Sequence, residues 1–212
     1  MRLGEALAAG ISALGLGLDD AIQARLLAYL TLLERWNRTH NLTSVRDPFG
    51  MLGHHVLDSL SVLPHLPARA RLRLIDVGSG GGLPGVPLAI ARPDWRVTLL
   101  DSSQKKSAFL RQTAAELGLV NVEVATARAE LFVPTQLFDV AIARALSDLA
   151  QFAALAAHLL APGGRLFAMK GGYPREEIAK LPGEISIVAT HRLIVPSLKS
   201  ERHLVILQAR AA

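Results

Sequence analysis

Cysteine is absent from this chain of 212 residues. The absence excludes disulfide bonds, zinc and iron–sulfur sites held by thiolates, and any thiolate nucleophile. Aromatic residues make up only 5% of the sequence, which argues against a reader of single-stranded nucleic acid that stacks several bases on rings. Long apolar runs are also missing, because the longest uncharged stretch, 149–164, includes Gln151 and His158 and ends in Pro-Gly-Gly. We therefore expect no membrane-spanning helix and a location in the cytoplasm.

Half of the residues are hydrophobic and 19% are charged, a balance that supports a full core and excludes a largely disordered chain. The length suits one domain with a small extension. The formal net charge is +5, and the first 60 residues carry five basic and six acidic groups, so the positive surplus lies in the rest of the chain. Such a surplus favours a polyanionic partner, although a mildly basic protein without one is the alternative.

The hydrophobic pattern changes near residue 66. Residues 1–66 predict a helical extension, since apolar side chains recur at helical spacing behind Asp19 and Asp20. Residues 67–212 predict one compact α/β unit of alternating strands and helices. The seven residues 196–202 are too few for a helical crossover between the last two strands, so we expect a mostly parallel seven-stranded sheet with a C-terminal antiparallel hairpin. The expected strands are 72–77, 96–100, 122–125, 138–143, 165–169, 185–195 and 203–207, and the clearest helices are 104–117 and 148–160.

The strongest local signal is a glycine-rich turn within 74–85, where an apolar strand leads into a loop and then a helix. Glycines let the backbone turn sharply and lie against a ligand without a Cβ in the way. Two cofactors compete for such a loop. The spacing of Gly80, Gly82 and Gly85 matches the dinucleotide fingerprint and favours NAD. Asp76 favours S-adenosylmethionine, because a carboxylate at the end of the strand would repel a pyrophosphate but suits a cationic methionine moiety.

Two further acids follow the next strands. Asp101 comes 23 residues after Gly78 and ends the second strand, where its carboxylate can accept hydrogen bonds from both ribose hydroxyls of either cofactor. Glu130 follows the third strand and can accept from an adenine amino group, or it is simply an exposed acid in the first turn of a helix. Since Asp101 suits both cofactors, Asp76 is the residue that decides for S-adenosylmethionine.

The residue at the end of the fourth strand limits the kinds of atom that such an enzyme could methylate. Enzymes that methylate the exocyclic amine of adenine carry an acid or amide followed by two prolines here, whereas this chain has Arg144. Attack on pyrimidine C5 usually needs a cysteine, and transfer to a ribose hydroxyl needs a group that removes a proton. The remaining class is a nucleophile with a free lone pair, such as guanine N7, which needs only alignment and neutralised phosphates.

Several cations are expected along the same edge of the sheet. Arg144, Lys170 and Arg202 are our candidates for positioning the substrate and gripping an RNA backbone, and Arg128 joins them as an RNA contact. Each could equally be an ordinary surface cation or a member of an ion pair. Tyr173 is the one aromatic side chain placed where it could touch the target base.

His54, His55 and Asp58 share one face of a predicted helix. Two or three ligands without a fourth make a metal site the weaker interpretation, so we expect no metal there. A hydrogen-bond network on that helix face is the better one.

Taken together, these motifs resemble the bacterial small-subunit (16S) ribosomal RNA guanine-N7 methyltransferase G family, also called glucose-inhibited division protein B. The resemblance covers nearly the whole chain. The pieces that carry it are Trp36-Asn37, Asn41-Leu42-Thr43, His55-x-x-Asp58-Ser59-Leu60, the loop from Asp76 to Pro87, Leu100-Asp101-Ser102, Arg128-Ala129-Glu130, Arg144-Ala145, Lys170-Gly171 and Glu201-Arg202-His203-Leu204. Ala129 and Ala143 depart from the larger apolar residue and the serine that relatives often carry, and both departures are conservative.

The resemblance implies a class I methyltransferase fold, which is Rossmann-like, with S-adenosylmethionine as methyl donor and N7 of one guanine in 16S ribosomal RNA as acceptor. The partner would be that RNA or the assembling small ribosomal subunit, bound by a monomer. The implied donor pocket includes Gly78, Leu83, Ala129, Glu130 and Arg144, to which the residue-level reasoning adds Asp76, Gly80 and Asp101. Two other hypotheses are an NAD-dependent oxidoreductase and an RNA-binding ribosome-assembly factor without catalytic activity.

Overall fold

A computed structural model describes residues 2–145 and 147–209 of the chain. Seven strands form one sheet in the order β3-β2-β1-β4-β5-β7-β6. The first five strands run parallel, and β7 pairs antiparallel with both β5 and β6. The expected mostly parallel sheet with a C-terminal antiparallel hairpin is therefore confirmed. The strands are β1 Arg73–Val77, β2 Arg96–Asp101, β3 Val122–Thr126, β4 Phe138–Arg144, β5 Leu160–Lys170, β6 Ile185–Arg192 and β7 His203–Ala209.

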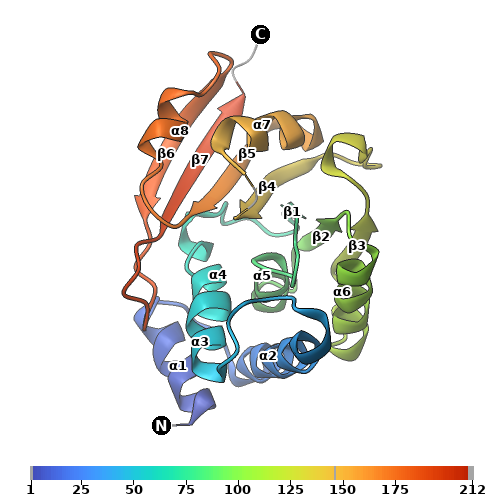
Figure 1. The fold of residues 1–212 in the computed structure, drawn as a ribbon, viewed down its shortest axis with the longest axis vertical. Helices are drawn as coiled ribbons and strands as arrows, with labels where there is room; N and C mark the ends of the chain where they lie inside the picture. The colour runs from blue at the N-terminus through green and yellow to red at the C-terminus, as the bar shows by residue number, and fades with distance from the viewer. Residues whose placement is uncertain (1, 146, 210–212) are drawn as a thin grey trace.

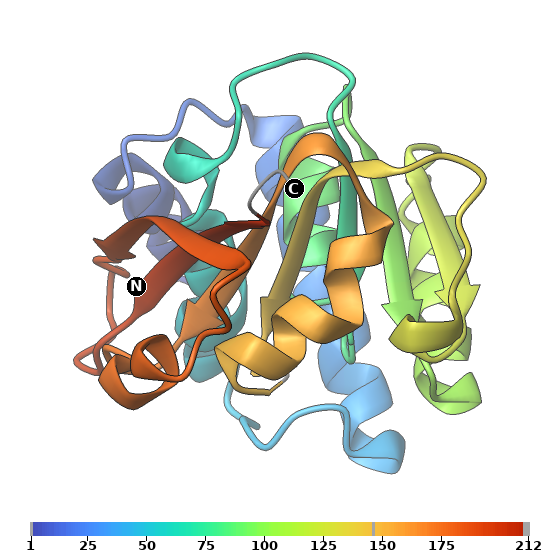
Figure 2. The same ribbon diagram turned by 90° about the horizontal axis from the view of Figure 1, so that it is seen from above.

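Helices cover both faces of the sheet (Figure 1). On one face lie α1 Leu3–Ala13, α2 Asp20–His40, α3 Pro48–Met51, a π-helix at Leu52–Leu57, α4 Asp58–Leu60, α5 Gly85–Ala91 and α6 Gln104–Glu116. On the other lie α7 Leu149–Ala156 and α8 Arg175–Ala179, in front of the sheet in Figure 2. Short 3₁₀ turns occupy Leu63–His65, Ala129–Leu131 and Ala157–Leu159.

The two faces arise from the alternation of side chains along each strand. In β1, Leu74 packs into the cluster that contains the N-terminal helices, α5 and α6, whereas Ile75 and Val77 pack into the cluster that contains α7. The N-terminal helices thus share a core with the sheet. The longest of them, α2, begins as expected behind Asp19, whose carboxylate accepts from the backbone N–H of Ile22 at 2.8 Å.

Two expected elements differ from the structure. The helix expected over 148–160 ends earlier, because β5 begins at Leu160, which pairs with Phe138 before the register shifts. Gly163, at φ +80°, lies within this irregular start of β5, and the expected strand 165–169 is its regular part. The strand expected over 185–195 ends at Arg192. Over residues 2–145 and 147–209, no helix is long and apolar enough to cross a membrane.

Candidate active site

The glycine-rich turn connects β1 to α5 along the edge where the parallel strands end. Gly78, Gly80 and Gly82 all adopt positive φ, at 73°, 58° and 87°. At Gly82 a Cβ would lie 2.5 Å from Cγ2 of Val86, so both conformation and space require glycine there. The loop is also held from the N-terminal side, because the Tyr29 hydroxyl donates to the carbonyl oxygen of Gly81 at 2.6 Å.

Asp76 does not reach the surface of this edge, and its expected contact with a ligand stays a prediction. Side chains alternate along β1, so Asp76 shares the face of Leu74 and points into the protein. Its side chain is fully buried, and Oδ2 accepts from the backbone N–H of Gly85 at 2.8 Å while Oδ1 has no partner among the described residues. Burial raises the pKa of Asp76 to about 7. Asp76 therefore supports the loop from beneath.

A first cavity of about 470 Å³, the Asp101 pocket, lies where β1 to β4 end. Six of the predicted site residues line it, namely Gly78, Asp101, Arg128, Ala129, Glu130 and Arg144. The others that line it are Val77, Leu100, Ser102, Lys106, Ala127, Ala145 and Leu155. Leu83 and Gly80 were also expected here but are not among the lining residues: Leu83 is buried, and the N–H of Gly80 donates to Asp101.

Asp101 is fixed by the backbone on both sides. Its Oδ2 accepts from the N–H of Gly80 at 2.9 Å and its Oδ1 from the N–H of Ser103 at 2.8 Å, with the Lys106 ammonium 3.8 Å from Oδ2. Each carboxylate oxygen has a second lone pair, so the same group can still accept from hydroxyls in the pocket. Lys106 lines the pocket as well, which the sequence analysis did not predict. Its position in the first helical turn after the second strand could have indicated it.

Two other charged side chains of the Asp101 pocket, those of Arg128 and Glu130, face solvent. Glu130 lies in the 3₁₀ turn after β3, and its Oε1 is 3.9 Å from Nη1 of Arg128. The side chains of Arg128 and Glu130 are 73% and 48% exposed, so a pair at this distance is weak and both groups can contact another molecule.

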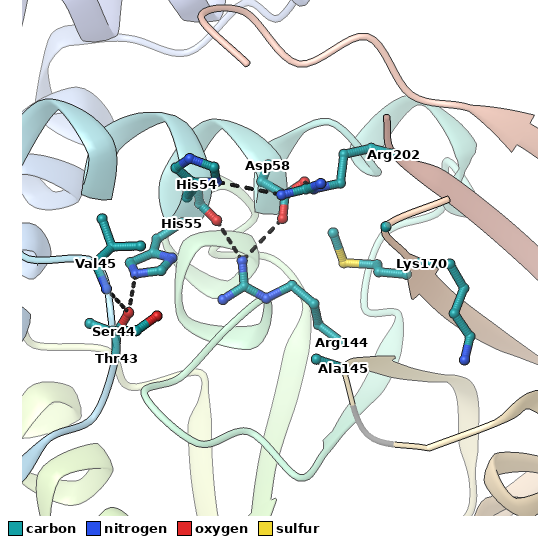
Figure 3. Close-up of a pocket in the computed structure, with 12 residues that line it drawn as sticks. Thr43, Ser44, Val45, His54, His55, Asp58, Arg144, Ala145, Lys170 and Arg202 are labelled. Carbon is teal, nitrogen blue, oxygen red and sulfur yellow. Dashed lines mark hydrogen bonds and ion pairs between the residues drawn. The ribbon is translucent and has the colours of Figure 1, made fainter. Parts of the chain in front are cut away.

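A second cavity of about 470 Å³, the Asp58 pocket, adjoins the first (Figure 3). It is lined by the loop after α2, the π-helix, the first residue of α4, the ends of β4 and β5, and the residue before β7. These residues are Thr43, Ser44, Val45, His54, His55, Asp58, Arg144, Ala145, Met169, Lys170, Gly171 and Arg202. Arg144 and Ala145 line both cavities, so the two pockets meet at the end of β4.

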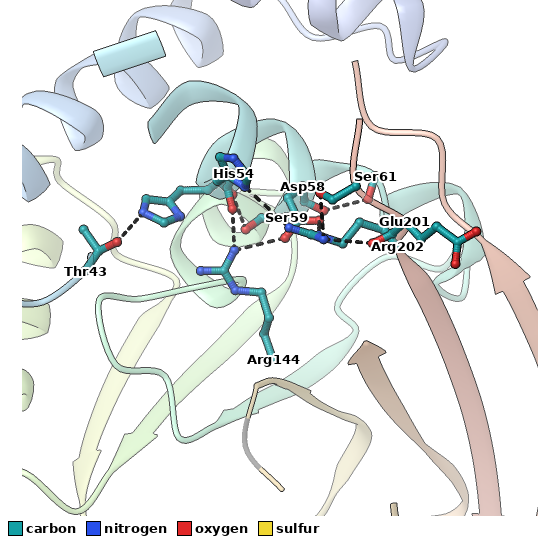
Figure 4. Close-up of polar contacts among 10 residues, drawn as sticks. Thr43, His54, Asp58, Ser59, Ser61, Arg144, Glu201 and Arg202 are labelled. Atoms are coloured by element: carbon teal, nitrogen blue, oxygen red, sulfur yellow. Dashed lines mark hydrogen bonds and ion pairs between the residues drawn. The ribbon is translucent and has the colours of Figure 1, made fainter. Parts of the chain in front are cut away.

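Asp58 pairs with two arginines in this pocket (Figure 4). Its Oδ2 accepts from Nη1 of Arg144 at 3.0 Å and its Oδ1 from Nε of Arg202 at 3.1 Å. Nη1 of Arg144 also donates to the carbonyl oxygen of His54 at 2.6 Å, and Nη2 of Arg202 is 3.4 Å from Nδ1 of His54. The side chain of Asp58 is 2% exposed and those of the arginines 20% each. The ion-pair interpretation of Arg144 and Arg202 therefore holds in this structure.

Lys170 is paired too, and Tyr173 lies outside the pocket. The Lys170 ammonium is 2.7 Å from Oε2 of Glu177 and donates to the carbonyl oxygen of Ser147 at 2.6 Å. Tyr173 is half exposed and packs its ring edge-on against His203, with 5.7 Å between centroids. It is not among the residues that line the Asp58 pocket, and its expected contact with a base stays a prediction.

His55 completes the wall of the Asp58 pocket. It is 5% exposed, and its Nε2 lies 2.7 Å from the hydroxyl of Thr43, which also accepts from the N–H of Val45. Burial and the positive charge of Arg144 lower the pKa of His55 to about 4, so the ring is neutral at neutral pH. The hydrogen-bond network expected at His54, His55 and Asp58 is present, but its partners are Thr43 and the two arginines.

Comparison with known proteins identifies the family. The family model described as rRNA small subunit methyltransferase G matches residues 22–205. The chain is 54% identical over 200 residues to the Ribosomal RNA small subunit methyltransferase G of Burkholderia ambifaria, covering 92% of this chain and 88% of that one. It is 51% identical over 210 residues to the protein of the same name from Laribacter hongkongensis, covering 99% and 100%.

A solved structure of a SAM-dependent methyltransferase from Thiobacillus denitrificans, in complex with S-adenosyl-L-homocysteine, shares the fold. The TM-score is 0.53 at 18% identity, with 85% of this chain and 97% of the other covered. The likeness confirms the expected Rossmann-like methyltransferase fold. The sequence match, which spans nearly the whole chain, decides against the oxidoreductase alternative: the chain belongs to the rRNA small subunit methyltransferase G family.

Proposed function

We propose that this protein transfers a methyl group from S-adenosylmethionine to N7 of a guanine in 16S ribosomal RNA. The observation that carries the proposal is the pair of cavities that meet at Arg144 and Ala145. One contains a backbone-fixed carboxylate, Asp101, and the other is walled by cations. A donor in the first and a nucleotide in the second would meet at the end of β4.

The Asp101 pocket fits the donor. Asp101 would accept from the ribose hydroxyls, and Glu130 would accept from the adenine amino group, with Ala129 and Gly78 against the ring and the ribose. S-adenosylmethionine supplies, when bound, a methyl group on a positively charged sulfur. Arg144 and Ala145 would line the passage between that methyl group and the neighbouring pocket.

The Asp58 pocket suits a nucleophile that has no proton to lose. Both carboxylate oxygens of Asp58 already accept from arginines, and His55 is held by Thr43 with a pKa of about 4, so neither is well placed as a general base. The N7 lone pair forms the new bond to carbon as the bond between sulfur and carbon breaks, and the positive charge moves to the base without proton transfer. The chain then needs only to align the guanine and neutralise nearby phosphates.

A methyl-transfer assay tests the proposal. The protein is incubated with S-adenosylmethionine labelled in the methyl group and with 16S RNA that lacks the modification, both as free RNA and within small subunits. We expect label at one guanine and cleavage of the chain there by borohydride and aniline, which is diagnostic of N7 methylation. Label at a ribose or an exocyclic amine would refute the choice of atom. Binding of RNA without any transfer would favour the assembly-factor hypothesis.

The proposed partner is 16S RNA, free or in an assembling subunit, bound by a monomer in the cytoplasm. The positive surplus of the chain after residue 60 supports a polyanionic partner.

A further inference from the structure

We propose that Asp58 is a positioning residue for this reaction, which fixes the guanidinium groups of Arg144 and Arg202 in the wall of the Asp58 pocket, and that the π-helix before it provides the second anchor for Arg144. The proposal rests on the function proposed above. Asp58 itself would contact neither the donor nor the reacting atoms, and would act through the two arginines.

The three charged residues come from remote parts of the chain. Asp58 follows the π-helix, Arg144 ends β4, and Arg202 immediately precedes β7. One buried carboxylate thus joins the N-terminal helices to two separate points on the sheet (Figure 4). Charge-assisted bonds of this kind to an almost fully buried acid set the orientation of the guanidinium groups strongly.

The π-helix explains why the second anchor is available. In an α-helix the N–H of Asp58 would donate to the carbonyl oxygen of His54, four residues back. Here it donates to the carbonyl oxygens of Gly53 and His55, five and three residues back, and not to that of His54. The carbonyl oxygen of His54 instead accepts from Nη1 of Arg144 at 2.6 Å. The π-helical turn therefore leaves the carbonyl oxygen of His54 directed towards the pocket. Such π-helical turns are frequent at functional sites.

The arrangement leaves Arg144 with donors for a ligand. Both of its hydrogen bonds use Nη1, and among the described residues none accepts from Nε or Nη2. Figure 3 shows one guanidinium nitrogen of Arg144 turned to Asp58 and His54, with the other two on the side away from them. Two arginines against one carboxylate also leave a net positive charge, which favours a phosphate or a carbonyl oxygen of the substrate.

The test compares Asp58→Asn with Glu116→Gln. Asparagine keeps the size of the side chain but removes the charge that two arginines share. Glu116 pairs with Arg35 between α2 and α6 and is 38% exposed, so its variant controls for the loss of an ion pair to the N-terminal helices. We expect kcat/KM for 16S RNA to fall about tenfold or more in Asp58→Asn and to change less than about twofold in the control.

A double-mutant cycle with Arg202→Gln separates positioning from a general loss of structure. If Asp58 acts through Arg202, the effect of Asp58→Asn on kcat/KM shrinks to about threefold or less in the Arg202→Gln background. Equal effects in both backgrounds, or full activity of Asp58→Asn, would overturn the proposal.

A spectroscopic measurement does not depend on activity. The Nε–H resonances of Arg144 and Arg202, assigned by ¹⁵N NMR, should both move in Asp58→Asn and stay in place in Glu116→Gln. Unmoved resonances would overturn the proposal even if activity fell. A wild-type protein that fails to methylate 16S RNA would instead refute the proposed function, while the resonances would still report whether Asp58 fixes the arginines.

Discussion

The two pockets that meet at Arg144 are of similar size but are built in different ways. The Asp101 pocket is formed mostly by residues at or just after the ends of β1, β2, β3 and β4, with Lys106 of α6 and Leu155 of α7 beside them. The Asp58 pocket needs the loop after α2 and the π-helix to close it against β4, β5 and the start of β7. Under the proposed assignment of the pockets, the strand ends form most of the donor side, and the N-terminal helices are needed to complete the RNA side.

The charges differ in the same way. Arg128, Glu130 and Lys106 around the Asp101 pocket are well exposed, and Asp101 is held by backbone N–H groups. In the Asp58 pocket the charges are largely buried and depend on one another. Substitutions in the Asp58 pocket should therefore affect the stability of the fold, whereas substitutions in the Asp101 pocket should mainly affect binding.

The largest effect is expected from Asp58→Ala. The substitution leaves Arg144 and Arg202 without their shared acid, and removal of one partner from a buried pair costs about 3 kcal/mol or more. We expect the free energy of unfolding, measured with urea, to fall by about this amount. Asp94→Ala breaks an exposed pair with Arg92 and should cost less than about 1 kcal/mol. Equal losses in the two variants would contradict the structural importance of the Asp58 cluster.

Asp101→Asn should affect the binding of S-adenosylmethionine but not the binding of RNA. Loss of the charged acceptor should weaken the affinity for S-adenosylmethionine by about 10- to 100-fold, since hydrogen bonds to charged groups contribute about 1.5–3 kcal/mol. Calorimetry measures this affinity, and a filter-binding assay measures that for 16S RNA, which should stay unchanged. Glu123→Gln, in β3 but outside the Asp101 pocket, is the matched control. If Asp101→Asn lowered the affinity for RNA and left the affinity for S-adenosylmethionine unchanged, the assignment of the two pockets would be reversed.

Asp76→Asn should change the pH dependence of stability. In the unfolded chain Asp76 ionises near 3.8, whereas burial raises the pKa to about 7 in the folded protein, so ionisation disfavours folding as pH rises through this window. The asparagine does not ionise. The free energy of unfolding of the variant, relative to wild type, should therefore increase between about pH 4 and about pH 7 and level off above that. A difference that stays constant with pH would show that the pKa of Asp76 is not raised.

The smallest effects are expected in the salt dependence of RNA binding. Arg128 is 73% exposed, so Arg128→Ala should lower the slope of log affinity against log salt by about one unit if it contacts a phosphate. Lys170 is 15% exposed and paired with Glu177, and Lys170→Ala should change the slope less. The opposite order would show that RNA displaces Glu177 from Lys170.

The difference in how the two pockets are built also explains which of their residues could be predicted from the sequence. Gly78, Asp101 and Glu130 line one pocket, as the sequence predicts, because each lies at or after the end of a strand that its apolar run reveals, and parallel strands end at one edge. The bonds of the Asp58 cluster join residues 90 and 144 positions apart, and no local pattern encodes such contacts. The motif His55-x-x-Asp58 indicated where the polar cluster lies in the chain, but not that Arg144 and Arg202 pair with Asp58.

The structure places two of the expected site residues outside the lining of both pockets. Asp76 was assigned to the ligand because it ends a strand, although the alternation from Leu74 places it on the inner face towards α5. Tyr173 was assigned to the base from its closeness to Lys170 in sequence, yet its ring turns to His203 across the β5–β7 pair. Tertiary contacts of this kind override sequence neighbourhood.

A crystal structure of the protein with S-adenosylhomocysteine tests the division between the pockets most directly. We predict the ribose hydroxyls within hydrogen-bond distance of Asp101, the adenine beside Ala129 and Glu130, and the sulfur at the boundary formed by Arg144 and Ala145, facing the Asp58 pocket. A ligand seated in the Asp58 pocket, or one whose ribose lies away from Asp101, would contradict it.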